Sequence, residues 1–328
     1  MRSSLAARTL GIAVAAALLQ LIMITAFSWP AARVAPRDVP IVVAGPQAAA
    51  VAERLDRERP GAFDVRTERD ETAARSALAD REAYGAVVST PSGPKVLTAS
   101  AASPVVAQQL TALAERLTPP AAGAGTAAVE DVVAADPDDP RGSGFGALAL
   151  PLIMSSLAAS VLLTFAVPAA GWRAAGVVLF AGLGALGVAG IAQSWLSVLP
   201  GSYLAIAGVM SLTILAVTGT VAGLAAAVGR AGLGVGALTM LLLGNPLSSA
   251  TSAPEMLPQP WGDIGQILPP GAAVTLLRST AFFDGAGAAG SAAVLAAWAA
   301  AGFGLLAVGG LRRRSRERSE PDREPAMA

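Results

Sequence analysis

The chain has no cysteine and no histidine, and Lys95 is its only lysine. Without cysteine there is no disulfide scaffold and no thiol nucleophile. Without either residue there are no Cys/His zinc sites and no histidine-based catalytic triads. Charge is scarce as well, because 14% of the 328 residues are charged, against about a quarter in a typical soluble domain. With 54% hydrophobic residues, the composition favours a multi-pass membrane protein.

Six apolar runs contain no acidic or basic residue, and a transmembrane helix needs about 20 predominantly apolar residues. The runs are Thr9–Trp29, Gly144–Val167, Ala174–Leu196, Tyr203–Val228, Gly232–Leu247 and Gly287–Leu311. We interpret the first as an uncleaved anchor, because the apolar core of a secretory signal is about 7–15 residues long. The glycine-rich stretches AGLGALGVAG (181–190) and AVGRAGLGVGA (227–237) predict close packing between helices.

The region Arg33–Arg141 has a different composition, with 12 basic and 16 acidic residues and hence a net charge of −4. Hydrophobic periodicity predicts strands at Pro40–Gly45, Phe63–Thr67, Tyr84–Thr90 and Pro94–Ser100, and helices at Gln47–Arg59, Glu71–Glu82 and Val105–Leu117. This alternation is typical of a small α/β domain with parallel crossovers. Its first strand-to-helix turn, AGPQAAA, lacks the glycines of a phosphate-binding turn, and Pro46 removes an N–H donor there. A module that contacts a partner or ligand is therefore favoured over nucleotide binding.

Arginines mark the ends of the apolar runs. Basic residues in short loops stay in the cytoplasm, while long domains are translocated largely regardless of charge. We therefore take as cytoplasmic topology anchors Arg8, Arg173, Arg230, Arg312, Arg313 and Arg314. This topology puts both chain ends in the cytoplasm and the α/β domain outside the cell (plasma) membrane.

The predicted fold is a membrane α-helical protein: six transmembrane helices with a small extracytoplasmic α/β domain inserted between helices 1 and 2. Residues 1–32 form the cytoplasmic N-terminus and helix 1, and residues 33–141 form the α/β domain. Residues 142–311 form a five-helix bundle with an outer re-entrant or interfacial segment at 251–286. Residues 312–328 form a basic cytoplasmic tail.

The predicted spans carry no Asp, Glu, Lys or Arg, which are the usual marks of proton relays and ion coupling. This argues against a proton-driven antiporter and an intramembrane aspartyl protease, and the missing bases argue against a serine protease. The chain has no Walker A pattern either, so an ATPase would be a separate partner. We expect no enzyme activity, no cofactor and no nucleic-acid partner, with membrane lipid as a contact.

The stretch LPQPWGDIGQILPPGAAVTLLRSTAFF (Leu257–Phe283) is too polar for a span and too apolar for an ordinary loop. Its prolines interrupt helix continuation, so we predict two short interfacial helices with a break at Pro269 and Pro270. Trp261 suits the membrane–water interface, and we expect Arg278 to turn toward water or phosphate. The candidate gate residues of the segment are Pro254, Glu255, Trp261, Pro269, Pro270, Leu277 and Arg278.

Two motifs carry a resemblance to a known family. DDPRGSGFGALALPL (Asp138–Leu152) enters the second predicted span, and NPLSSATSAPEMLPQPWGDIGQILPPGAAVTLLR (Asn245–Arg278) links the fifth and sixth. With the layout of spans, they resemble the permease subunit of type-2 ABC exporters, in the phage-infection-protein-like branch. The resemblance implies re-entrant helices beside an export path, an ABC ATPase partner, and a homodimer or a heterodimer with a second permease. It also implies outward movement of an amphipathic or lipid-like substrate.

One feature departs from that family. Its permeases engage the ATPase through cytoplasmic helices before the first span and between the second and third, whereas Pro168–Arg173 is short and only eight residues precede Thr9. Three classes of function stay open. They are an exporter subunit, a non-transporting membrane anchor whose outer domain binds a cell-envelope component or partner protein, and a membrane enzyme, which the missing bases and metal ligands disfavour.

Overall fold

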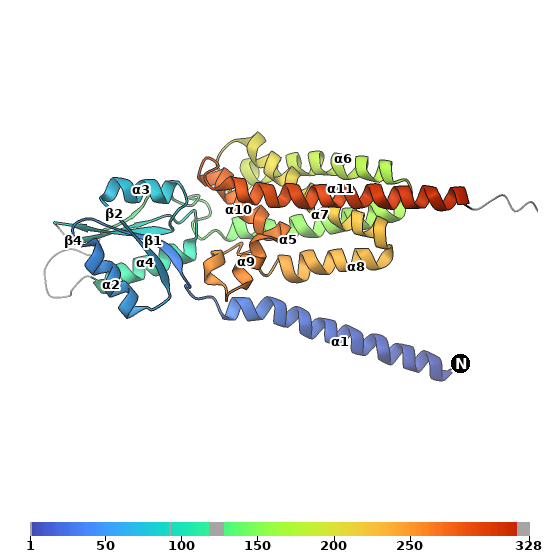
Figure 1. The fold of residues 1–328 in the computed structure, drawn as a ribbon, viewed down its shortest axis with the longest axis horizontal. Coiled ribbons are helices and arrows are strands. Elements are labelled where there is room, and N and C mark those ends of the chain that lie inside the picture. The colour runs from blue at the N-terminus through green and yellow to red at the C-terminus, as the bar shows by residue number, and fades with distance from the viewer. Residues whose placement is uncertain (1, 92, 118–127, 320–328) are drawn as a thin grey trace, which may run out of the picture.

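The computed structural model describes residues 2–91, 93–117 and 128–319. A small α/β domain lies at one end of the molecule and a helical bundle at the other (Figure 1). The elements of the first part are α1 (Arg2–Ala32), β1 (Val39–Ala44), α2 (Ala48–Glu58), β2 (Phe63–Glu68), α3 (Glu71–Ala79), β3 (Gly85–Thr90), β4 (Gly93–Thr98), α4 (Pro104–Leu117) and β5 (Ala128–Asp131). The second part contains α5 (Ser143–Ala166), α6 (Ala170–Gly190), η1 (Ile191–Trp195), α7 (Tyr203–Val228), α8 (Arg230–Leu238), η2 (Thr239–Gly244), η3 (Pro254–Met256), α9 (Trp261–Gln266), α10 (Pro269–Phe282) and α11 (Ala288–Ser319).

The sheet has the strand order β2-β1-β3-β4-β5. β1 pairs in parallel with β2 and β3, β3 and β4 pair antiparallel, and β4 and β5 pair in parallel. Helix α3 covers one face, while α2 and α4 cover the other (Figure 1). The seven elements predicted in this region are confirmed, with boundaries that shift by up to three residues.

The fifth strand, β5, was not predicted. It has four residues, none of them fully buried, so no hydrophobic alternation marks it. A charge cluster holds it in place: Glu130 of β5 accepts from Arg75 of α3 at 2.5 Å and lies 2.8 Å from the Lys95 ammonium of β4. The carboxylate of Glu71 forms salt bridges with the same two side chains, Arg75 and Lys95. Pairing with β4 and these salt bridges therefore hold β5 in the sheet, although its local sequence does not predict a strand.

Five helices of the described chain are long and apolar enough to cross a membrane, which indicates a multi-pass membrane protein. They are Leu5–Ala32, Ser143–Ala166, Ala170–Trp195, Tyr203–Val228 and Ala288–Arg313. The remaining expected span, Gly232–Leu247, corresponds to the shorter apolar helix Arg230–Gly244, which combines α8 with the π-helical turn η2. The six-span count therefore stays a prediction.

Helix α7 is the centre of the bundle, where it contacts α5, α6, α8, α10 and α11. Against α11 it packs through glycine: a Cβ added to Gly223 would lie 2.3 Å from the carbonyl oxygen of Gly302. Against α8 it packs just as closely, since a Cβ on Gly232 would lie 2.1 Å from the oxygen of Leu224. This confirms the predicted close packing within AVGRAGLGVGA.

The other predicted stretch, AGLGALGVAG, packs through alanine. Ala181, Ala185 and Ala189 of α6 are buried in the core of the bundle at a spacing of four residues. Gly182 and Gly187 have no atom near the position of an added Cβ, so they point away from neighbouring helices. The predicted close packing through small residues is confirmed here as well, with the alanines of the stretch on the contact face.

Helix α1 diverges from the bundle toward its N-terminal end (Figure 1), and its most apolar window is not buried inside the molecule. It contacts η2, and Trp29 near its C-terminal end meets Trp261 of α9 edge-on with ring centroids 6.1 Å apart. The start of α1 and the end of α11 lie at the end of the molecule opposite the α/β domain (Figure 1).

Candidate functional site

Residues 251–286, the junction segment, lie between the α/β domain and the bundle (Figure 1). Two of its helices match the prediction, because α9 begins at Trp261 and α10 begins at Pro269 after the expected break. A short 3₁₀ turn, η3, precedes them at Pro254–Met256. Proline supplies the first residue of both η3 and α10, a position where its missing N–H costs nothing.

The start of the junction segment belongs to the core of the α/β domain. Met256 is fully buried and packs in one cluster with Val39 and Ile41 of β1. The backbone oxygen of Met256 accepts hydrogen bonds from the Ala35 N–H at 3.0 Å and from Nη1 of Arg37 at 2.9 Å. The α/β domain therefore completes its core with residues more than 200 positions further along the chain.

The end of the junction segment is bound to the same domain. Phe283 is buried with the side chains beneath α3, and the guanidinium of Arg81 lies 5.2 Å from the centre of its ring. Nη1 of Arg81 also donates to the Thr275 oxygen of α10 at 3.0 Å. Both ends of the segment are therefore fixed to the α/β domain.

A buried hydroxyl and a carboxylate connect the two parts directly. The Tyr84 hydroxyl, just before β3, donates to Oε2 of Glu255 in η3 at 2.9 Å. Burial raises the pKa of Tyr84 well above its ordinary value, and the charge of Glu255 raises it further. The phenol therefore stays protonated and keeps donating to the carboxylate across the physiological pH range.

Arg278 lies in a place the sequence did not predict. We expected it to reach water or phosphate, but its side chain is 4% exposed. Nη2 donates to the Ala250 oxygen at 3.0 Å, and the guanidinium lies 4.9 Å from the ring centre of Phe145. Burial lowers the pKa of Arg278 to about 10, which leaves it charged at neutral pH. Carbonyl oxygens and an aromatic face replace water around this cation.

Phe145 is held in place by Asp139 of the motif that enters α5. Oδ2 of Asp139 accepts from the Phe145 N–H at 2.7 Å, and Oδ1 accepts from the Ser143 hydroxyl at 3.2 Å. Asp139 thus satisfies one of the free amide groups in the first turn of α5. The cation–π contact joins Phe145 to Arg278, so the two motifs meet in space. The contact between the motifs was not predicted from the sequence.

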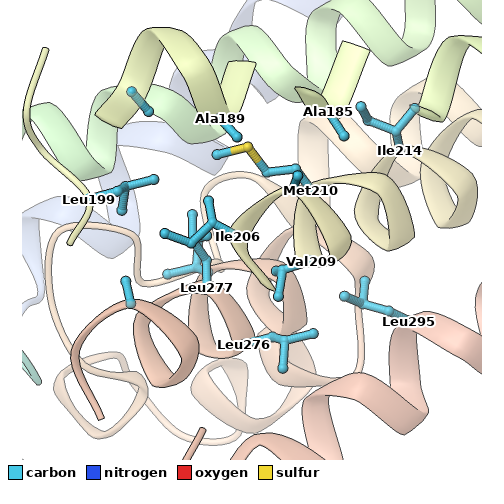
Figure 2. Close-up of a cluster of buried hydrophobic side chains, with 14 of the residues drawn as sticks. Ala185, Ala189, Leu199, Ile206, Val209, Met210, Ile214, Leu276, Leu277 and Leu295 are labelled. Carbon is cyan, nitrogen blue, oxygen red and sulfur yellow. The ribbon is translucent and has the colours of Figure 1, made fainter. Parts of the chain in front are cut away.

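Helix α10 also closes a small apolar cavity of about 30 Å³ in the bundle. Pro270 and Leu277 line it together with Phe145 of α5 and Met210 of α7. Figure 2 shows Leu277 beside Ile206 of α7, and Leu276 on the side nearer Leu295 of α11. The same helix that binds the α/β domain through Thr275 is therefore part of the core of the bundle.

The other predicted gate residues surround this helix. Pro269 is buried at its first position, and Pro270 packs against η2, where a Cβ on Gly244 would lie 2.6 Å from Pro270 Cγ. Pro254 and Glu255 are partly buried in η3. Trp261 is 39% exposed, which is compatible with the expected interfacial position. The seven candidate residues lie on η3, α9 and α10 of the junction segment.

The predicted topology anchors lie in helices. Arg8 is exposed in α1, Arg230 is exposed at the first position of α8, and Arg312, Arg313 and Arg314 belong to α11. Residues 320–328 of the predicted tail lie outside the described residues.

Arg173 was expected in a loop. Instead it is buried in the first turn of α6, where Nε and Nη2 donate to the Val167 oxygen at the end of α5. Arg173 lies in a helix and not in a loop because it caps α5. The last carbonyl groups of a helix carry partial negative charge and attract a basic side chain.

No protein-family model, curated protein or solved structure matches this chain. Within the described residues, no group of three or more acidic side chains is arranged to hold a metal ion. The site is therefore characterised by its own geometry: a segment whose two ends are fixed in the α/β domain and whose middle is packed in the bundle.

Proposed function

We propose that the chain is the membrane permease subunit of an ABC-type exporter in the cell membrane. In this proposal both termini are cytoplasmic, the α/β domain is extracytoplasmic, and α8 with η2 makes the sixth crossing. The subunit moves an amphipathic or lipid-like substrate outward, with energy from a separate ATPase. It works as a homodimer or with a second permease, and it is not itself an enzyme.

One observation carries the proposal: α10 is shared between the α/β domain and the cavity in the bundle. Arg81 holds its Thr275 carbonyl from one side, while Leu277 lines the cavity on the other. A displacement of α10 therefore changes the cavity and the α/β domain together. Packed interfaces of this kind switch between discrete arrangements rather than deforming continuously, which is what a gate on an export path requires.

The lipid-facing surface supports the membrane assignment. Large apolar side chains are exposed along α1, including Leu10, Ile12 and Leu21, and along α6, including Leu179 and Leu183. Such a surface would aggregate in water. It is the expected surface of helices surrounded by acyl chains.

The alternative is a non-transporting anchor whose α/β domain binds a cell-envelope component or partner protein. The short connections favour it: three residues, Val167 to Ala169, join α5 to α6, and Gly229 alone joins α7 to α8. Among the described residues, neither connection holds a helix on which an ATPase could dock. The exporter proposal then requires the ATPase to contact the helix ends themselves, including the basic end of α11.

Purification of the tagged full-length chain from its native membranes tests the proposal. We expect an ABC ATPase to co-purify, and removal of that ATPase to abolish outward movement of the substrate. The absence of any ATPase would reject the exporter proposal. Capture of an envelope component by the full chain, together with export that is unchanged when the chain is deleted, would establish the anchor instead.

A further inference from the structure

A second cavity lies at the other end of the bundle, away from the α/β domain. Its volume is about 1230 Å³, and the ends of α5, α6, α7 and α11 enclose it. One side is polar, with Thr164, Arg173 and Arg313. The rest of the lining is mostly apolar, and it includes Phe303 and the exposed Leu311 of α11. The exporter proposal makes no use of this amphipathic cleft.

Capping explains only part of the placement of Arg173. Nε and Nη2 donate to the oxygens of Val167 and Thr164, which close the end of α5. Nη1 makes no hydrogen bond to any residue that the structure describes. The side chain as a whole is 8% exposed, so this third nitrogen remains a donor within a largely buried group.

A second polar group in the cleft has no partner. Oγ1 of Thr164 is buried and forms no hydrogen bond with any described residue. A buried hydroxyl without a partner is costly, and such groups in native structures commonly bond to a ligand, ion or water. Thr164 lies in the last turn of α5, and its backbone carbonyl accepts a hydrogen bond from Nη2 of Arg173.

Two further features make the polar side attractive to an anion. The 21-residue helix α6 begins in the cleft with Ala169 as its N-cap, and no side chain caps its first amide groups. Arg313 brings a second cation from α11, where Nη1 donates to the Pro168 oxygen at 3.0 Å. None of the described residues lining the cleft is acidic. A helix N-terminus with two guanidinium groups favours a phosphate.

We propose that this cleft binds an acidic phospholipid, with its headgroup phosphate on Arg173 and Arg313. One acyl chain lies along Phe303 and the exposed side chain of Leu311, apolar groups that a free phosphate would leave in contact with water. Trp172 is 76% exposed at the same end of α6 and suits the headgroup level of the membrane. The site is independent of transport and depends on no ATPase.

Native mass spectrometry of the full chain in detergent tests the proposal, with phosphatidylglycerol and phosphatidylcholine as probes. We expect retention of phosphatidylglycerol in preference to phosphatidylcholine. Arg313→Gln should weaken the binding of phosphatidylglycerol by about fivefold, the effect of removing one basic residue near a charged headgroup. Thr164→Val, which keeps the side-chain shape, should weaken it by up to about fivefold.

Arg312→Gln is the matched control, because it removes the same charge from the neighbouring position, which does not line the cleft. It should bind phosphatidylglycerol as the wild type does.

Arg173→Gln removes the cap of α5 as well, so Arg313→Gln and Thr164→Val decide the outcome if that variant does not fold. Unchanged lipid binding in both variants overturns the site. If inorganic phosphate displaces the lipid and stabilises the chain equally well, the lipid assignment is overturned and a soluble phosphate is the ligand.

Discussion

The hydroxyl of Tyr84 donates a 2.9 Å hydrogen bond to the carboxylate of Glu255, 171 positions further along the chain. It is one of several contacts through which η3 completes the α/β domain, and it lies beside the cations of Arg81 and Arg278. Together with the bond from Arg81 to the Thr275 carbonyl, it joins the α/β domain to the junction segment of the bundle. Its removal should therefore reduce the stability of both.

Tyr84→Phe removes the donor and leaves a partly buried carboxylate without its partner. Hydrogen bonds to charged groups contribute about 1.5–3 kcal/mol, so we expect a clear fall in the thermal midpoint of the detergent-solubilised chain. Tyr203→Phe is the matched control, since its hydroxyl bonds the Leu186 carbonyl at an exposed position, and its effect should be smaller. Equal midpoints for the two variants would contradict a special role for the Tyr84 bond.

Arg278 should depend on Phe145 for part of its stability. Arg278→Gln removes the cation together with its bonds to the carbonyls of Ala250 and Ser252, and Phe145→Leu removes the ring. We expect the two effects on unfolding to be non-additive, with a coupling of about 0.5–2 kcal/mol from the cation–π contact. A double-mutant cycle measures it, and strictly additive losses would mean that the ring is only a packing partner.

The failure to predict the position of Arg278 has a physical cause. The sequence correctly indicated two helices with a break at Pro269, and Val274, Leu277 and Ala281 of α10 are buried on one face. The interpretation assumed membrane on one side of α10 and water on the other. In fact the chain at Ala250–Ser252 and Phe145 of α5 lie against Arg278, and the Ser279 hydroxyl donates to the Ala286 carbonyl, so both residues are buried. Periodicity identifies the faces of a helix, but it does not identify what covers each face.

The elements of the α/β domain were predictable because each has a clear local pattern, as in β1, where five of six residues are hydrophobic and buried. Strand β5 and the junction depend instead on contacts between distant residues. Met256 reads as part of a proline-rich loop, and nothing local indicates that it fills the core around Val39. The candidate segment was therefore identifiable from the sequence, but its attachment to the α/β domain was not.

The charge cluster around β5 predicts a loss of stability in acid. The side chains of Arg75 and Lys95 lower the pKa of Glu130 to about 2 from an ordinary value of 4.5. A lowered folded-state pKa stabilises the fold above pH 4.5, and that contribution is lost as the pH falls from 4.5 toward 2. We expect faster amide exchange in β5 at pH 3 than at pH 6, after correction for intrinsic rates. In Glu130→Gln this difference should shrink, and an unchanged difference would exclude Glu130 as its cause.

Two glycines of α11 provide the sharpest test of the bundle. A Cβ on Gly302 would lie 2.4 Å from the Gly219 carbonyl carbon of α7, whereas a Cβ on Gly304 would meet nothing within 4 Å. Gly302→Ala should therefore push α7 and α11 apart and cost about 1–3 kcal/mol. Gly304→Ala, two residues along the same helix, should be neutral or stabilising by about 0.5–1 kcal/mol, because alanine restricts the unfolded chain more than glycine. Thermal midpoints of the two variants in one detergent measure the difference, and a shift of the same sign and size in both would contradict the direct backbone contact.

Because α7 also contacts α10, Gly302→Ala should in addition increase amide exchange in α10, while Gly304→Ala should not.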